Sequence, residues 1–151
     1  MKIISNVLEF REWRKKNSSS IGFVPTMGAL HKGHLSLIKY SQNICEKTVV
    51  SIYLNPTQFS LNEDLNKYPQ NFNNDIKKLK NEKVDCVFAP SDNTMYPKEF
   101  NTKVKVYELT KYLEGGSRPN FFEGVTTIVT KLFNIIQPSH AFFGEKDWQQ
   151  L

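Results

Sequence analysis

The sequence lacks any run of apolar residues long enough to cross a membrane, because a spanning helix needs about 18 in succession. Lys, Asn, Thr or Pro interrupts each of its longer apolar stretches. Its first residues, MKIISNVLEFREWRKK, hold too few apolar side chains for a secretory signal, and no small-residue cleavage site follows them. We therefore expect a soluble, cytoplasmic protein with no membrane partner.

Cysteine is scarce as well, since the chain has only Cys45 and Cys86, far apart and each in an apolar context. This gives no support for a disulfide framework or for a CxxC metal or redox site. We expect both thiols to be buried and inert.

Acidic residues are in the minority, with 15 Asp and Glu against 20 Lys and Arg and a net charge of +5. Such a charge permits phosphate-bearing partners without requiring them. Four lysines cluster on one predicted helix without the interleaved aromatics of a single-strand binder: Lys77, Lys78, Lys80 and Lys83. We interpret them as a solvated face and expect no nucleic-acid partner.

The length of 151 residues and a hydrophobic content of 39% fit one domain over residues 1–151, or one domain with a fragment of another. Apolar, β-branched runs predict strands at residues 21–25, 48–54, 84–89 and 141–143, and a short strand at 104–107. Helical spacing predicts helices from about residue 33, over 72–83 and over 125–136. Residues 55–69 read as a long loop.

Strands that alternate with helices predict an α/β protein, with a parallel sheet covered by helices on both faces. In such sheets, ligands bind outside the carboxyl ends of the strands. Those ends are followed here by residues 25–34, 55–59 and 144–150, which are also the most unusual segments of the sequence. We expect all three segments to meet at one rim.

The pattern His31-x-Gly33-His34 lies between the first of these strands and a helix. A helix start offers free N–H groups and a positive dipole end, and two imidazoles beside it can donate to phosphate oxygens. Two ordinary surface histidines remain an alternative. A metal site is disfavoured, because the third histidine is the distant His140 and no acidic or thiol residue stands at ligand spacing.

Several blocks, in order along the chain, resemble the pantoate–β-alanine ligases, a family within the HxGH nucleotidyltransferases. They are VPTMGALHKGHLSLI, SIYLNPTQF, DLNKYP, FAPSDNTMYP, LEGGSRP, EGVTTIVTKLFNIIQP and FFGEKDWQQL. HxGH alone marks the wider superfamily, whereas the NPTQF and GEKDWQQL blocks together single out this member. The resemblance covers residues 1–151 and implies a Rossmann-like, doubly wound sheet.

The resemblance also implies a two-step reaction. The pantoate carboxylate attacks the α-phosphorus of ATP, which releases pyrophosphate and leaves pantoyl adenylate, and the β-alanine amine then displaces AMP. Mg²⁺ would shield the phosphates, and the enzyme would bind pantoate, β-alanine and ATP. We also expect a homodimer, because dimers are the commonest oligomers.

By matching positions, the resemblance implies roles for residues in all three segments. His31 and His34 would act on the phosphates, with His34 as proton donor, and Lys146 would neutralise phosphate charge. Gln58, beside Asn55, would hold pantoate and the amine, and Gln150 would hold pantoate. The ATP site would be lined by Met27, Gly28, Ala29, Leu30, His31, Lys32, Gly33, His34, Gly144, Glu145, Lys146 and Asp147.

The residues themselves leave alternatives open. NPTQF in isolation favours loop capping by Asn55, and GEKD can be a helix start with Asp147 as its cap. Asp75 can reach a metal, but a helical Asp among lysines is more often a solvated partner of a lysine. Arg118 is a weak candidate for a phosphate contact.

Two departures from the family pattern stand out. Where the family usually reads RPGHF, this chain has Asn120 and Phe121 in place of the Gly and His. Asn tolerates a left-handed backbone, so the loop can survive, but any polar role of that histidine is lost. The chain also ends at Leu151, about half the family's usual length, so we expect it to lack the last strands and the small C-terminal domain.

That ending leaves two further hypotheses beside the ligase. The chain is a module that binds ATP or pantoate without turnover, or it is another HxGH nucleotidyltransferase. Gln58 and Gln150 in their blocks argue against the latter.

Overall fold

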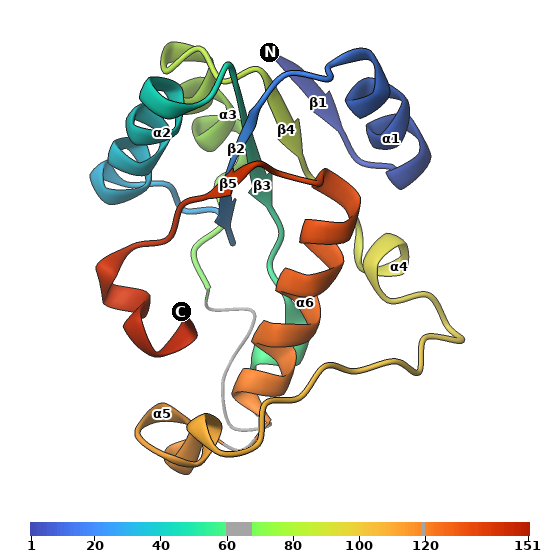
Figure 1. The fold of residues 1–151 in the computed structure, drawn as a ribbon, viewed down its shortest axis with the longest axis vertical. Helices are drawn as coiled ribbons and strands as arrows, with labels where there is room; N and C mark the ends of the chain where they lie inside the picture. The colour runs from blue at the N-terminus through green and yellow to red at the C-terminus, as the bar shows by residue number, and fades with distance from the viewer. Residues whose placement is uncertain (60–67, 119) are drawn as a thin grey trace.

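The computed structural model describes residues 1–59, 68–118 and 120–151. Within them, five parallel strands form one sheet in the order β1-β4-β3-β2-β5 (Figure 1). The strands are β1 Lys2–Ile4, β2 Ile21–Thr26, β3 Lys47–Ile52, β4 Cys86–Phe88 and β5 His140–Ala141. The predicted α/β class and parallel sheet are confirmed.

Helices and short 3₁₀ turns connect these strands. The helices are α1 Val7–Lys16, α2 Lys32–Ile44, α3 Phe72–Asn81, α4 Asp92–Met95, α5 Glu114–Ser117 and α6 Phe121–Ile136. The 3₁₀ turns are η1 Pro56–Gln58, η3 Leu109–Lys111 and η4 Glu145–Gln150. Part of the predicted loop at 55–69 is therefore the turn η1, and residues 60–67 lie outside the described residues.

Helices cover both faces of the sheet. Successive residues of each strand point to opposite faces, so each strand contributes to two separate cores. Phe23, Val49 and Phe88 pack with α1, α4 and α6 in one core. Val24, Val50 and Val87 pack with α2 and α3 in the other. Figure 1 shows α2 and α3 on one side of the strands and α1 on the other, with α6 running past the carboxyl ends of the strands.

The prediction of a strand at 104–107 is wrong. The N–H of Val104 donates to Thr127 Oγ1 at 3.0 Å, and its carbonyl accepts from Thr126 Oγ1 at 2.6 Å. These two α6 side chains take the hydrogen bonds that a neighbouring strand would otherwise satisfy. The segment is extended, but it does not join the sheet.

The element β1 and the helix α1 were not predicted from the sequence. In β1 only Ile4 is buried, and α1 buries only Phe10, so neither element shows a long apolar pattern. The other predicted helices and strands form with shifted ends; α6, for example, begins at Phe121 rather than at residue 125. Cys45 and Cys86 are buried and free, as predicted.

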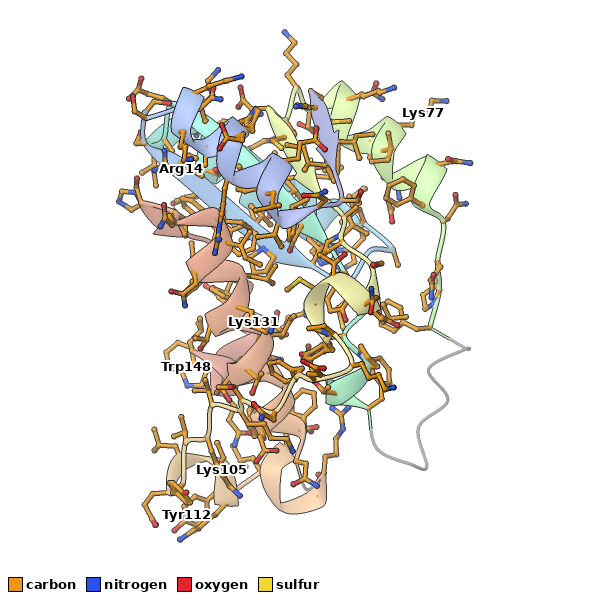
Figure 2. The ribbon with its side chains drawn as sticks, turned by 90° about the vertical axis from the view of Figure 1, so that its right-hand side faces the viewer. Arg14, Lys77, Lys105, Tyr112, Lys131 and Trp148 are labelled. Carbon is orange, nitrogen blue, oxygen red and sulfur yellow. The ribbon has the colours of Figure 1, made fainter. Side chains whose placement is uncertain are left out.

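Of the four clustered lysines, Lys77, Lys80 and Lys83 are exposed, and Figure 2 shows Lys77 pointing away from α3. Lys78 instead donates to the carbonyl oxygen of Leu30. The interpretation as a solvated face is therefore wrong for Lys78. In the described part of the chain, none of the helices combines the length and apolarity needed to cross a membrane.

Gly124 is the point of closest approach between α6 and η1. A Cβ at this position would lie 2.3 Å from the carbonyl oxygen of Thr57. The Gly124 carbonyl also accepts a hydrogen bond from Asn55 Nδ2 at 3.2 Å. The absence of a side chain therefore lets α6 hold the turn that carries Gln58.

We expect Gly124→Ala to lower the free energy of unfolding by about 1–3 kcal/mol, the usual effect of overpacking. Gly116→Ala is the matched control, because its Cβ would meet Lys111 O at an ordinary 3.4 Å. Urea denaturation of both variants measures the difference. Equal stabilities would show that α6 and η1 do not depend on this contact.

Candidate functional site

A cleft of about 580 Å³ opens at the carboxyl ends of β2, β3 and β5. It is bounded by the loop after β2, by η1, by α6 and by η4. Nine of the predicted site residues line it: Met27, Ala29, His31, His34, Asn55, Gln58, Lys146, Asp147 and Gln150. The three segments predicted to share one rim therefore meet in one cavity.

The other predicted site residues do not line this cleft. Leu30 is 2% exposed and belongs to the core under α2 and α3. Gly28 borders a neighbouring cavity. Lys32 and Gly33 form the first turn of α2, and Gly144 and Glu145 precede the lining residues of η4. These last four residues are neighbours in sequence of residues that line the cleft.

Hydrogen bonds at the end of β2 hold the loop that follows it. Thr26 Oγ1 donates to Ser51 O at 2.7 Å and accepts the N–H of Gly28 at 3.2 Å. Gly28 and Ala29 then take left-handed conformations, with φ of +89° and +51°. Two successive left-handed residues reverse the chain between the end of β2 and the start of α2.

Asp75 on α3 supports this reversal, a role that the sequence analysis did not assign to it. It is 1% exposed, and its two carboxylate oxygens accept the N–H groups of Ala29 and Leu30, each at 2.9 Å. Asp75 is therefore an acceptor for backbone N–H groups, a role that differs from both interpretations given above, a metal ligand and a solvated partner of a lysine. The available signal was its position on the same helix face as Ile76 and Leu79, because a buried carboxylate needs donors.

The two histidines form a capping box at the start of α2. His31 Nδ1 accepts the N–H of Gly33 at 3.1 Å, and His34 Nδ1 accepts the N–H of His31 at 3.4 Å. Their rings stack with centroids 4.1 Å apart. Because both Nδ1 atoms accept, these bonds assign the proton of each neutral ring to Nε2.

The pKa of His34 is lowered to about 4, mainly by burial, with smaller lowering effects from His31 and Lys146. His34 is therefore neutral at pH 7 in the free protein. A neutral imidazole can donate a hydrogen bond from Nε2 but is a poor source of a proton. The expected role of His34 as a proton donor stays a prediction.

Asn55 is 1% exposed and its side chain is fully engaged. Its Oδ1 accepts from Tyr96 Oη and Thr57 Oγ1, both at 2.9 Å, and its Nδ2 donates to Gln58 Oε1 at 2.8 Å. The capping alternative for Asn55 is the one observed. Among the described residues Gln58 Nε2 has no partner, so Asn55 leaves it available to the cleft.

The segment after β5 brings an ion pair, Lys146 with Asp147, to the wall of the cleft that η4 forms. Lys146 Nζ contacts both Asp147 oxygens at 2.7 and 2.9 Å, and Gln150 Nε2 donates to Asp147 Oδ1 at 3.4 Å. GEKD does start a 3₁₀ turn, as the alternative interpretation held, but Asp147 does not cap it, because η4 begins at Glu145 after Gly144 and has no side-chain cap.

The floor of the cleft is apolar and comes largely from α6. Sequence periodicity placed these side chains in the core, and it gave no sign that they also face a cavity. They are Val125, Ile128, Val129 and Leu132, joined by Phe143 after β5. The cleft therefore offers a polar rim over an apolar floor, the usual composition of small-molecule sites.

The two residues that stand where the family usually has Gly and His lie near the cleft. Asn120 has a φ of +70°, so the predicted left-handed backbone is confirmed. Phe121 lies under the Arg118 guanidinium, 3.9 Å from its ring centroid. Arg118 also donates to the Gln58 carbonyl at 3.2 Å and lies 3.5 Å from Glu114 Oε2. Phe121 thus replaces a polar group with a face that holds the guanidinium.

Comparisons with known proteins agree on one family. The family model described as Pantoate-beta-alanine ligase matches residues 2–151. The pantothenate synthetase of Thermotoga petrophila is 52% identical over 153 residues, which cover 99% of this chain and 55% of that protein. That of Aquifex aeolicus is 51% identical, with coverages of 99% and 53%. The chain therefore spans about half the length of the curated relatives it matches.

Solved structures match to the same extent. The pantothenate synthetase of Thermus thermophilus has a TM-score of 0.95 and 44% identity, covering 99% of this chain and 54% of that one. The Francisella tularensis pantoate–β-alanine ligase, complexed with beta-gamma ATP and β-alanine, has a TM-score of 0.95 and 41% identity, with coverages of 99% and 59%.

We expect His34 to titrate near pH 4 in the free protein, with its proton on Nε2 above that pH. Long-range ¹H–¹⁵N correlation spectra measure both properties, and His34→Gln identifies the signals. An added nucleotide should raise the pKa, because phosphate charge favours the imidazolium. A free-protein pKa near 6.5, or a proton on Nδ1, would contradict the capping box.

Proposed function

The chain belongs to the pantoate–β-alanine ligase family, and we propose that its cleft carries out the ATP-dependent condensation of pantoate with β-alanine through pantoyl adenylate. The supporting observation is that one cavity combines the His31–His34 helix start with the Gln58 and Gln150 side chains. Membership of this family argues against the alternative of another HxGH nucleotidyltransferase.

The triphosphate would lie at the start of α2. The first N–H groups of a helix and its positive dipole end favour an anion there. His31 and His34 would add Nε2–H donors directed at the phosphate oxygens. Such fixed donors stabilise the charge that develops as pyrophosphate leaves, without reorganisation during the reaction.

Lys146 would contribute a positive charge only after an exchange of partners. Its ammonium group is bound to Asp147 and is largely exposed, so a phosphate can replace the carboxylate at little cost. The change in Lys146 partner would therefore accompany nucleotide binding. Arg118, held by Phe121 and the Gln58 carbonyl, remains a weaker candidate for a phosphate contact.

Pantoate would occupy the part of the cleft between the glutamines and α6. Its two methyl groups suit the apolar floor formed by Val125 and Val129, and its hydroxyl and carboxylate oxygens need donors. Gln58 Nε2 and the Gln150 amide would supply them. Asn55 would act through Gln58, because its own polar atoms already have partners.

Both steps of the reaction would then take place with the pantoyl group in one position in the cleft. The pantoate carboxylate oxygen attacks the α-phosphorus, the bond to pyrophosphate breaks, and the mixed anhydride remains over the apolar floor. The β-alanine amine next attacks the acyl carbon near Gln58, loses a proton and expels AMP. Positioning supplies most of the rate in such a sequence.

Mg²⁺ is proposed to arrive with the nucleotide. Mg²⁺ usually binds one or two carboxylates together with substrate phosphates. Within the described ranges no group of three His, Cys, Asp or Glu could hold a metal alone, and Asp147 is a carboxylate that lines the cleft. The ion would shield the phosphate charge. The expected homodimer and cytoplasmic location stay predictions.

The function is tested by supplying the 151-residue chain with Mg-ATP and pantoate, with and without β-alanine. We expect pyrophosphate release to need ATP and pantoate, and pantothenate and AMP to need all three substrates. His34→Ala should slow pyrophosphate release at least about 100-fold, whereas His140→Ala, on β5 outside the cleft, should not. Saturable binding without turnover would identify a binding module, and no binding would refute the proposal.

Gln58→Ala should raise the KM for pantoate and for β-alanine by about tenfold or more, the usual loss for a donor to a charged or polar group. The KM for ATP should change less. Initial rates with each substrate varied in turn measure all three constants, and Gln42→Ala, whose side chain contacts Glu82 outside the cleft, is the control. A defect confined to ATP would remove Gln58 from the pantoate site.

A further inference from the structure

The backbone of Leu30 is held from both sides by one turn of α3. Asp75 Oδ1 accepts its N–H at 2.9 Å, and Lys78 Nζ donates to its carbonyl oxygen. Asp75 Oδ2 also accepts the N–H of Ala29 at 2.9 Å. We call these contacts of Asp75 and Lys78 the α3 clamp.

The loop needs such a clamp because its conformation is unfavourable by itself. Ala29 has a φ of +51°, a region that costs an alanine roughly 1–2 kcal/mol. The Asp75 carboxylate is 1% exposed and would lose its solvation without compensation if the two N–H groups moved away. The strained loop and the buried charge therefore stabilise each other.

The clamped residue directly precedes the first histidine. Leu30 is followed by His31, the N-cap of α2, whose ring stacks on that of His34. A shift of the Leu30 backbone would move the N-cap and break the bond from His31 N–H to His34 Nδ1, which is already long at 3.4 Å. The position of both imidazoles thus depends on contacts made by a helix that does not itself carry them.

We propose that Asp75 and Lys78 are positioning residues that hold the Nε2–H groups of His31 and His34 toward the cleft. Neither residue would touch the substrate; each would act through the backbone of Ala29 and Leu30. The inference rests on the proposed function for the identity of the ligand, and on the geometry of the clamp for everything else.

Titration of His34 separates positioning from a direct effect of charge. The groups that act on its pKa, besides burial, are His31, Lys146, Asp147 and Asp75. The negative charge of Asp75 raises this pKa, so its simple removal would lower it below about 4. Release of the loop would instead expose the imidazole and raise the pKa toward about 6.5. The two explanations predict opposite signs.

The experiment uses Asp75→Asn and Lys78→Met in the whole chain. Asn keeps one acceptor but places an NH₂ group against the second N–H donor, and Met keeps much of the length of Lys without its donors. We expect the His34 pKa to rise in both variants and its preference for Nε2–H to weaken. The same ¹H–¹⁵N correlation spectra measure both changes.

Asp85→Asn is the matched control. Asp85 likewise accepts a backbone N–H, from Thr48 at 2.8 Å, and contacts Lys47 at 3.0 Å, but it lies at the amino end of β3 and β4. Its replacement should leave the His34 pKa unchanged. An unchanged or lower pKa in Asp75→Asn and Lys78→Met would overturn the clamp. If Asp75→Asn does not fold, the preference of His34 for Nε2–H in Lys78→Met decides, because loss of the lysine charge alone would raise the pKa without changing the tautomer.

Pyrophosphate release gives the second readout. Small misplacements of positioned groups cost up to about 100-fold in rate, so we expect kcat to fall about 10- to 100-fold in Asp75→Asn, with a smaller change in the KM for ATP. A wild-type chain that makes no pyrophosphate, while its variants shift His34 as expected, would refute the function and keep the clamp. Normal kcat in both variants would refute the clamp alone.

Discussion

The parallel pairing of β2 with β3 and with β5 decides where the cleft lies. Thr26 at the end of β2 pairs with Ile52 at the end of β3, and Phe23 pairs with Ala141 of β5. The chain therefore leaves all three strands at the same edge, although these strands are distant in sequence. Because both faces of the sheet are covered by helices, this edge is where a ligand can meet loops from several strands.

The charges around the cleft are largely compensated within the protein. Asp75 is bound by two N–H groups, Lys146 by Asp147, and Arg118 lies beside Glu114 and the Gln58 carbonyl. The nearby imidazole of His34 on α2 is neutral at pH 7. Recognition of an anion would therefore depend first on oriented N–H donors at the start of α2, with the lysine as a later contribution.

Much of this arrangement could be predicted from the sequence, because apolar strands followed by TMGALHKGH, NPTQF and GEKDWQQL placed the three rim segments. The roles of individual side chains depended on contacts between distant segments. Asp75 looked like a helical carboxylate among lysines, since the loop that it binds lies 45 residues earlier. Asn55 and Gln58 both read as loop amides, and the bond to Tyr96 distinguishes them. Residues 104–107 have strand-forming side chains, but two threonines of α6 take the backbone hydrogen bonds of Val104.

The shortness of strand β5 has a consequence for the dynamics of the cleft. It is only two residues long, and its ladder pairs only Gly22 with His140 and Phe23 with Ala141, yet it carries the segment that holds Lys146. Elements with few pairing contacts open at lower free energy than the long strands of the core. One wall of the cleft can therefore detach by local unfolding while the loop between β2 and α2 keeps its shape.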